Sequence, residues 1–148
     1  MRLALGCDHR GLELKNKIID YVKTQGHAVQ DFGCFTNDSA DYPDHAAAVA
    51  ECVAKGQADY GILVCASGIG MSITANKYQG IRAALCCGPE LAVRARLHNN
   101  ANVLCLGADF ISSADALQAV TNFISTDFEG GRHQRRLDKI AKIESCQV

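Results

Sequence analysis

The chain has 148 residues, of which 48% are hydrophobic and 21% charged, and its formal net charge is −1 at pH 7. This length and composition predict one globular domain over residues 1–148 and exclude a fibrous or intrinsically disordered protein. The small net charge gives no electrostatic reason to expect a nucleic-acid or membrane partner. Any binding of anions therefore depends on a local cluster of cations.

The amino terminus and the cysteines predict a cytoplasmic protein with reduced thiols. The apolar run in "MRLALGCDHRG" is too short for a signal peptide, and no window reaches the length of a membrane-spanning helix. Several of the eight cysteines fall in apolar, strand-like runs, and none belongs to a Cys-x-x-Cys pair. We therefore expect neither a disulfide framework nor a bound metal.

Apolar runs alternate with helical stripes along the whole chain. Strands are predicted at residues 2–7, 27–33, 59–65, 81–87 and 102–107. Helical patterns occur at residues 12–26 and 43–56, after the glycines at 68 and 70, at 89–99, from 112, and from about 131 into residues 145–148. The second strand alternates with polar residues, as near a sheet edge. Residues 59–65 are continuously apolar, as in a strand covered on both faces, and residues 81–87 and 102–107 are expected to form two more buried strands. This order predicts a three-layer, doubly wound α/β domain with a parallel sheet.

In such a sheet, ligands bind beyond the carboxyl ends of the strands. The segments at these ends contain polar residues: Cys7-Asp8-His9, Cys65-Ala66-Ser67-Gly68, Gly88-Pro89 and Gly107-Ala108-Asp109. The sequence therefore predicts a functional site at this edge.

The stretch "GILVCASGIGMSITANK" (61–77) combines a strand end, a cysteine and a glycine-rich turn. A cysteine phosphatase loop needs an arginine where Met71 stands, and a dinucleotide fingerprint needs a third glycine where Ile73 stands. What remains is a series of backbone N–H groups from Ala66 to Met71, which predicts stabilisation of a negatively charged oxygen and of a thiolate at Cys65. A thiolate beside an anion hole suits the removal of a proton next to a carbonyl.

Each candidate residue also has a purely structural interpretation. Cys65 could be a small core residue, and His98 a solvated residue at a helix end. Asp8 and His9 could be capping residues of the following helix. The functional interpretation is favoured because Asp8, His9, Cys65 and Ser67 all fall at one edge of the predicted sheet.

The stretch "GGRHQRR" (130–136) supplies the local cation cluster. Arg132 and Arg136 are four residues apart, so on a helix they point the same way and can bind one dianion, although they could also form a solvated face. Arg135 points elsewhere. A pair of arginines that can bind a phosphate, together with a thiolate base, indicates an enzyme that acts on a sugar phosphate.

Motifs along nearly the whole chain carry a specific resemblance: "GCDHRGLELK", "DYPD", "CASGIGMSITANK", "GIRAAL", "HNNANVLCLG" and "EGGRHQRRLDKI". In order and spacing they closely resemble the type B ribose-5-phosphate isomerases of the ribose/galactose isomerase family. The resemblance implies a Rossmann-like, five-stranded parallel sheet and a homodimer with active sites at the interface, the C-terminal helix packing on the dimer partner. It also implies no metal or other cofactor, and the interconversion of ribose 5-phosphate and ribulose 5-phosphate in the pentose phosphate pathway.

By the same resemblance, Cys65 is the base that moves a proton between C2 and C1 through a cis-enediolate. The residues implied to line the anion hole around the enediolate oxygens are Ser67, Gly68, Ile69 and Gly70.

The remaining substrate contacts are implied in the same way. Asp8 and Tyr42 bind sugar hydroxyls, and His98, which opens the furanose ring, reaches in with Asn99 from the second subunit. The residues implied to hold the phosphate are His9, Arg132 and Arg136.

Three positions depart from the family pattern. Ala66 replaces a common glycine, Asn100 stands where aspartate is frequent, and Asp109 stands where many members have an arginine that helps hold the phosphate. We expect Asp109 to turn away from the phosphate or to bind a hydroxyl. A six-carbon substrate such as allose 6-phosphate or galactose 6-phosphate therefore stays an alternative. Outside enzymes, a sugar-phosphate-binding module or a redox sensor at Cys86 and Cys87 stays open, although adjacent strand cysteines form a strained bond.

Overall fold

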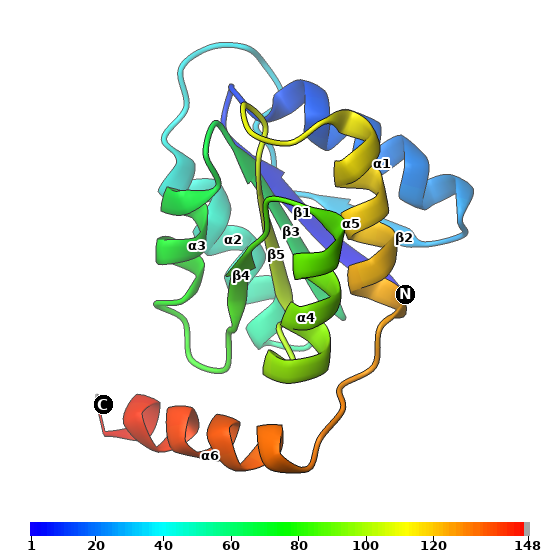
Figure 1. Ribbon diagram of the computed structural model, residues 1–148. Helices are drawn as coiled ribbons and strands as arrows, with labels where there is room; N and C mark the ends of the chain where they lie inside the picture. The colour runs from blue at the N-terminus through cyan, green and yellow to red at the C-terminus, as the bar shows by residue number, and fades with distance from the viewer. Residues whose placement is uncertain (147–148) are drawn as a thin grey trace.

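A computed structural model describes residues 1–146 and contains five parallel strands in the order β2-β1-β3-β5-β4 (Figure 1). The strands are β1 (Arg2–Cys7), β2 (Ala28–Asp31), β3 (Tyr60–Cys65), β4 (Ala83–Leu85) and β5 (Val103–Gly107). The helices are α1 (Leu12–Thr24), α2 (Tyr42–Ala54), α3 (Ile69–Ala75), α4 (Pro89–Asn99), α5 (Ser113–Ser125) and α6 (Arg132–Ser145). The predicted doubly wound, three-layer α/β fold is confirmed.

Helices cover both faces of the sheet, and each face forms its own apolar core. Helices α1, α4 and α5 pack on one face, and α2 and α3 pack on the other. Successive side chains of a strand point to opposite faces, so Ile62 and Val64 of β3 enter the first core while Leu63 and Cys65 enter the second. This double burial explains why the sequence of β3 is continuously apolar.

The two edge strands are shorter than the patterns predict. The prediction that β2 lies near an edge is confirmed. The strand predicted at residues 81–87 is present, but its predicted burial is wrong. Strand β4 covers only Ala83–Leu85 at the other edge, and Leu85 is 37% exposed. Its apolar sequence does not reveal an edge position, because burial of a strand depends on which strands pair beside it.

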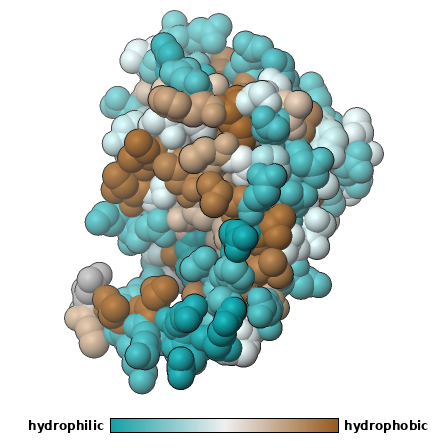
Figure 2. Space-filling model, viewed as in Figure 1, coloured by the Kyte–Doolittle hydropathy of each residue, from teal (hydrophilic) through white to brown (hydrophobic). Residues whose placement is uncertain are grey.

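Helix α6 leaves the body of the molecule beyond the amino ends of the strands (Figure 1). The side chains that it buries are His133 and Leu137, whereas Ile140 and Ile143 are exposed. The predicted continuation of this helix to residues 147 and 148 lies outside the described residues. Hydrophobic side chains also gather on the surface over α3 (Figure 2), where Ile69 and Ile73 are exposed.

Within residues 1–146, no helix combines the length and the apolar character that crossing a bilayer requires. All eight cysteines are free thiols.

Candidate active site

The turn that follows β3 fixes the direction of the candidate base. Cys65 is the last residue of the strand, and the Gly68 N–H donates a hydrogen bond to Cys65 Sγ at 3.1 Å. Gly68 has φ of 77°, a left-handed conformation, and a Cβ at this position would lie 2.5 Å from Leu85 Cδ1. Glycine is required here because a side chain would meet both conformational strain and a neighbouring residue.

Cys65 is 5% exposed, so it is buried like a core residue and also tied to the turn by its sulfur. The neighbouring Ser67 Oγ accepts a hydrogen bond from the Ile69 N–H at 3.3 Å. Two of the N–H groups expected to line an anion hole therefore donate to the Cys65 and Ser67 side chains. These two hydrogen bonds fix the conformation of the turn and the direction of its N–H groups.

Tyr42 lies against the same turn, although it begins α2 on a different part of the chain. A Cβ on Gly70 would lie 2.6 Å from the Cε2 and Cζ atoms of Tyr42. The ring can approach the backbone of α3 this closely only because residue 70 is glycine. The structure therefore places the predicted hydroxyl-binding Tyr42 beside the cysteine turn.

The loop after β1 places Asp8 and His9 at the same edge. Asp8 is buried, and its Oδ1 accepts hydrogen bonds from the N–H groups of Arg10 at 2.9 Å and Gly11 at 3.0 Å. Asp8 therefore closes the turn before α1, and its interpretation as a cap is wrong, because the N-cap residue of α1 is Gly11 and no side chain caps this helix. His9 Nδ1 accepts a hydrogen bond from the Ala40 N–H at 3.2 Å, which joins the loop to the segment before α2.

The loop after β5 completes this edge. The Ala108 N–H donates to the Cys65 carbonyl at 2.8 Å, and the Asp109 N–H donates to the Ala66 carbonyl at 3.0 Å. The Asp109 carboxylate forms an ion pair with Arg10, with Nη2 and Oδ2 at 2.8 Å. Asp109 was expected to turn away from a phosphate or to bind a hydroxyl. In the structure it binds a cation from the β1 loop, and its behaviour toward a phosphate or a hydroxyl stays a prediction.

The structure places the other predicted site residues at the opposite end of the sheet: His98, Asn99, Arg132 and Arg136. The turn between α4 and β5 lies beside the start of β3, because the Gly61 N–H donates to the Asn102 carbonyl at 2.9 Å. Cys65 is four residues farther along β3, or about 13 Å at the usual rise of a strand. Within one chain, the predicted residues therefore form two separate groups.

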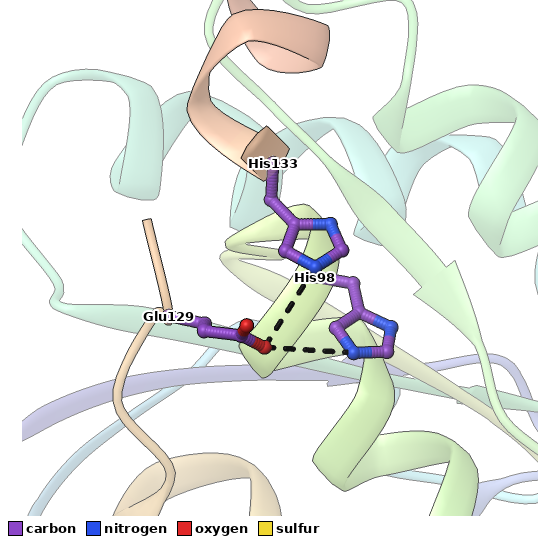
Figure 3. Close-up of side chains that lie close together, drawn as sticks. All are labelled: His98, Glu129 and His133. Carbon is purple, nitrogen blue, oxygen red and sulfur yellow. Dashed lines mark ion pairs between the residues drawn. The ribbon is translucent and has the colours of Figure 1, made fainter. Parts of the chain in front are cut away.

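Two histidines and a glutamate join α4 to the start of α6 (Figure 3). The His98 and His133 rings are stacked with centroids 4.3 Å apart, and their Nε2 atoms lie 3.8 and 3.7 Å from Glu129 Oε2. Burial lowers the pKa of His133, the neighbouring His98 lowers this pKa further, and Glu129 acts in the opposite direction. The environment therefore favours a neutral His133.

Within the described residues 1–146, the possible ligand atoms of these three side chains all lie within 4.8 Å of one another, which is close enough to share a metal ion. An ion bound by two imidazole nitrogens lies in the plane of both rings. The His98 and His133 rings are only 11° from parallel, so their planes do not meet near the nitrogens. One ring would have to turn to share an ion. The expected absence of a metal stays a prediction.

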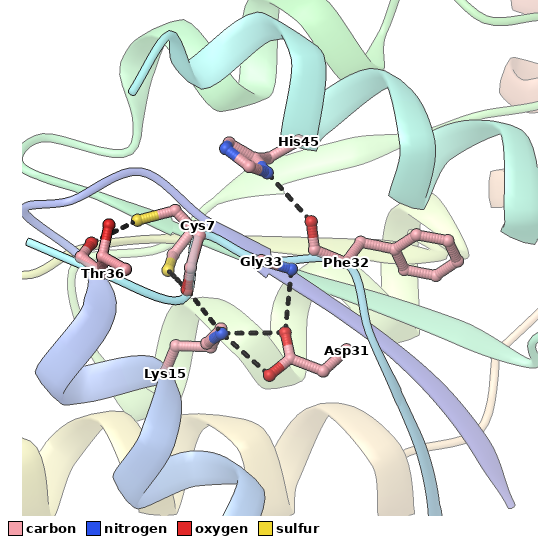
Figure 4. A network of polar contacts seen from close by, with 8 residues as sticks. Cys7, Lys15, Asp31, Phe32, Gly33, Thr36 and His45 are labelled. Atoms are coloured by element: carbon pink, nitrogen blue, oxygen red, sulfur yellow. Dashed lines mark hydrogen bonds and ion pairs between the residues drawn. The ribbon is translucent and has the colours of Figure 1, made fainter. Parts of the chain in front are cut away.

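A buried lysine supports the loop that contacts His9 (Figure 4). The Lys15 side chain is fully buried, and its Nζ donates to both Asp31 carboxylate oxygens at 2.8 Å and to the Cys34 carbonyl at 2.9 Å. Asp31 Oδ1 also accepts from the Gly33 N–H at 2.9 Å. These bonds fix the path of the chain after β2, which continues to the Ala40 contact.

Replacing Lys15 with alanine should lower the free energy of unfolding by about 3 kcal/mol, because it leaves Asp31 without its cation and the Cys34 carbonyl without a donor. Urea denaturation measures this loss. Lys17→Ala is the matched control on the same helix, since Lys17 forms an exposed i,i+4 pair with Glu13 and should lose less than about 0.5 kcal/mol. Equal losses in the two variants would show that the Lys15 network does not stabilise the fold.

Sequence reasoning did not single out Arg10, Glu129 or His133. Glu129 directly precedes the glycine pair of "EGGRHQRR", and His133 lies two residues after this pair. An acidic residue four positions before a histidine is the signal for that pair. Arg10 directly follows His9, but its ion partner is 99 positions away in the chain, so local sequence carries no sign of it.

A doubly wound parallel sheet with a cysteine turn and polar loops beyond its strand ends is typical of α/β proteins that bind small molecules at that edge. A model of the ribose/galactose isomerase family matches residues 3–140. The chain belongs to this family, as its motifs predicted.

Individual relatives share nearly the full length of the chain. Ribose-5-phosphate isomerase B of Escherichia coli is 42% identical over 143 residues, which cover 97% of this chain and 96% of that protein. The structure of Clostridium thermocellum ribose-5-phosphate isomerase B matches with a TM-score of 0.98 and 44% identity, covering 100% of both chains. The Mycoplasma genitalium enzyme, solved with bound ribulose 5-phosphate, matches with a TM-score of 0.94 and 42% identity over 97% of this chain and 96% of that one.

Proposed function

We propose that this protein is a cytoplasmic aldose–ketose isomerase that interconverts ribose 5-phosphate and ribulose 5-phosphate in the pentose phosphate pathway, without a metal or other cofactor. The observation that carries the proposal is Cys65 Sγ, held by the Gly68 N–H at the carboxyl edge of the sheet, in a chain of the ribose/galactose isomerase family. The relative with bound ribulose 5-phosphate supports this choice of substrate. The free cysteines support a reducing compartment.

The cysteine turn can perform the proton transfer. As a thiolate, Cys65 takes the proton from C2 of the open-chain aldose, and the electron pair moves onto the carbonyl oxygen to form an enediolate. Backbone N–H groups of the turn from Ser67 to Gly70 stabilise this oxygen, and those of Gly68 and Ile69 are shared with the Cys65 and Ser67 side chains, to which they donate in the structure. The thiol then returns a proton to C1, while a proton moves between the two oxygens. The product is the ketose, and the thiolate is regenerated.

A second copy of the chain supplies the residues that one chain keeps apart from Cys65. In the proposed homodimer, His98 and Asn99 of the second copy reach the cysteine turn, and His98 opens the furanose ring. Arg132 and Arg136 of the second copy hold the phosphate together with His9 of the first. The separation of the two groups within one chain supports this arrangement.

Exposed apolar side chains support the same dimer. Ile69 and Ile73 of α3 lie on a face where hydrophobic side chains gather (Figure 2), and Ile140 and Ile143 project from α6. A groove of about 590 Å³ separates α6 from β4, so this helix is not packed tightly on its own sheet. Burying these surfaces against a second copy would remove apolar area from water.

A redox sensor at Cys86 and Cys87 is less well supported. Cys86 is buried, and burial raises the pKa of its thiol to about 12, whereas Cys87 is exposed. Thiol exchange needs a thiolate, so Cys86 is a poor partner for Cys87.

Incubation with ribose 5-phosphate in deuterated water tests the proposed function. The expected result is equilibration with ribulose 5-phosphate and incorporation of deuterium into this product next to its carbonyl. NMR measures both changes. We expect turnover of allose 6-phosphate and galactose 6-phosphate to be at least about tenfold slower, a difference of about 1.4 kcal/mol in transition-state binding. Faster turnover of a hexose phosphate would establish the six-carbon alternative, and binding without turnover would establish a binding module.

A further inference from the structure

An ion pair crosses the end of the strand that carries the candidate base. Arg10 lies in the loop after β1, and Asp109 lies in the loop after β5. Strand β3 pairs with both of these strands and lies between them in the sheet. The 2.8 Å contact between Arg10 Nη2 and Asp109 Oδ2 therefore joins the two loops that flank Cys65.

Backbone hydrogen bonds hold both members of this pair against site residues. The Arg10 N–H donates to Asp8 Oδ1 at 2.9 Å, and the Asp109 N–H donates to the Ala66 carbonyl at 3.0 Å. Arg10 also directly follows His9, the residue proposed to contact the phosphate from the same loop. The backbone of Arg10 is thus tied to the β1 loop, and its guanidinium is tied through Asp109 to the β5 loop on the other side of the cysteine turn.

Both side chains of the pair face solvent: Arg10 is 56% exposed and Asp109 is 44% exposed. A guanidinium has five N–H donors in a planar fork, and the contact with Asp109 is made by Nη2 alone. Arg10 can therefore bind an oxyanion without releasing Asp109. The carboxylate restricts the rotamers of the arginine, which lowers the entropy lost when an anion binds.

A second ion pair provides an internal comparison. Arg2 and Asp59 form a contact of the same length, 2.8 Å, with similar exposure, 56% and 39%. Arg2 begins β1 and Asp59 directly precedes β3, so this pair lies at the amino ends of the strands. Two arginine–aspartate pairs of matched geometry thus lie at opposite edges of one sheet, and only the Arg10 pair adjoins the cysteine turn.

We propose that Arg10 binds the phosphate group of the substrate and that Asp109 is a positioning residue that holds Arg10 across the carboxyl end of β3. This inference rests on the proposed function and adds a cation to the phosphate site, supplied by the same chain as Cys65. Charge-assisted hydrogen bonds from a guanidinium to a phosphate are strong and directional. Arg10 therefore contributes to selection of phosphorylated over free sugars.

Competitive inhibition by inorganic phosphate tests the assignment directly. For Arg10→Met we expect both the Ki of phosphate and the KM for ribose 5-phosphate to rise about tenfold, with kcat within about threefold, because the lost contact binds substrate and transition state alike. Arg10→Lys should recover part of the loss, since a lysine keeps the charge but not the fork. Arg2→Met is the matched control and should leave both constants within about twofold of wild type.

The positioning role of Asp109 has its own readout. Asp109→Asn should raise the Ki of phosphate by about threefold, and adding it to Arg10→Met should raise the Ki no further, because Asp109 acts through Arg10. A Ki that falls in Asp109→Asn would show that the carboxylate repels the anion and would overturn this role.

Failure of this inference is distinguishable from failure of the proposed function. If wild-type protein converts ribose 5-phosphate and Arg10→Met keeps the wild-type Ki for phosphate, the assignment of Arg10 is wrong and the isomerase is unaffected. If wild-type protein converts no sugar phosphate, the proposed function is wrong, and an NMR titration with phosphate still compares Arg10→Met with Arg2→Met. Should Arg10→Met fail to fold, Arg10→Gln and Arg10→Lys make the same comparison.

Discussion

Replacing Cys65 with alanine should slow the isomerisation of ribose 5-phosphate by a factor on the order of 10² or more, the usual loss when a general base is removed. The reason is geometric: Cys65 Sγ lies 3.1 Å from the Gly68 nitrogen, in a turn that presents further N–H groups to a developing oxyanion. The KM should change little, because the phosphate and hydroxyl contacts remain. Exchange of deuterium from solvent into ribulose 5-phosphate measures proton removal itself.

Cys105→Ala is the matched control for this variant. Cys105 is also a buried strand cysteine, and burial raises the pKa of its thiol, a shift that the nearby Cys65 increases. Its replacement should lower stability by about 1 kcal/mol while kcat stays close to wild type. Near-wild-type exchange in Cys65→Ala would remove Cys65 from the mechanism. An equal loss of kcat in the two variants would indicate a packing role for both.

Mixing two inactive variants should restore activity if each active site contains residues of two chains. In a heterodimer of Cys65→Ala with the Arg132→Ala/Arg136→Ala double variant, one site carries both defects and the other carries none. Random exchange makes half of the dimers heterodimers, so a 1:1 mixture should reach about a quarter of wild-type activity. Refolding of the mixed chains followed by assay below the wild-type KM measures this recovery.

A second mixture controls for this result. Cys65→Ala and His9→Ala alter residues that lie at the same end of the sheet in one chain, so each site of their heterodimer keeps one defect. Their mixture should show no more activity than the average of the separate variants. Recovery in this mixture, or its absence in the first, would contradict the two-chain site. Sedimentation of the wild-type protein as a monomer would also contradict it.

Much of the sheet edge that carries Cys65 was predictable, because the relevant signals are local. The apolar run ending at Cys65, and the glycines after it, predict a strand and a tight turn from neighbouring residues alone. The rule that ligands bind at the carboxyl ends of parallel strands then groups Asp8 and His9 with Cys65. Both residues lie at that edge in the structure, and Tyr42 joins them through its packing on Gly70.

Long-range contacts account for what the patterns did not predict. The exposed position of β4 depends on strand order, since a strand at the sheet edge can have the same apolar sequence as a central one. Asp109 departs from the family pattern, but its partner Arg10 lies 99 residues away and places a cation beside it. The cluster of His98, Glu129 and His133 forms because α6 begins beside the end of α4.

The alternation of strands and helices, the cysteine turn and the family motifs follow from the residue pattern alone, because periodicity and turn chemistry are properties of adjacent residues. The folded arrangement is needed to show that Cys65 lies at one end of the sheet and the pair Arg132 and Arg136 at the other, and that Arg10 is paired across β3. Such distances depend on how the whole chain is wound around its sheet. No short stretch of residues contains that information.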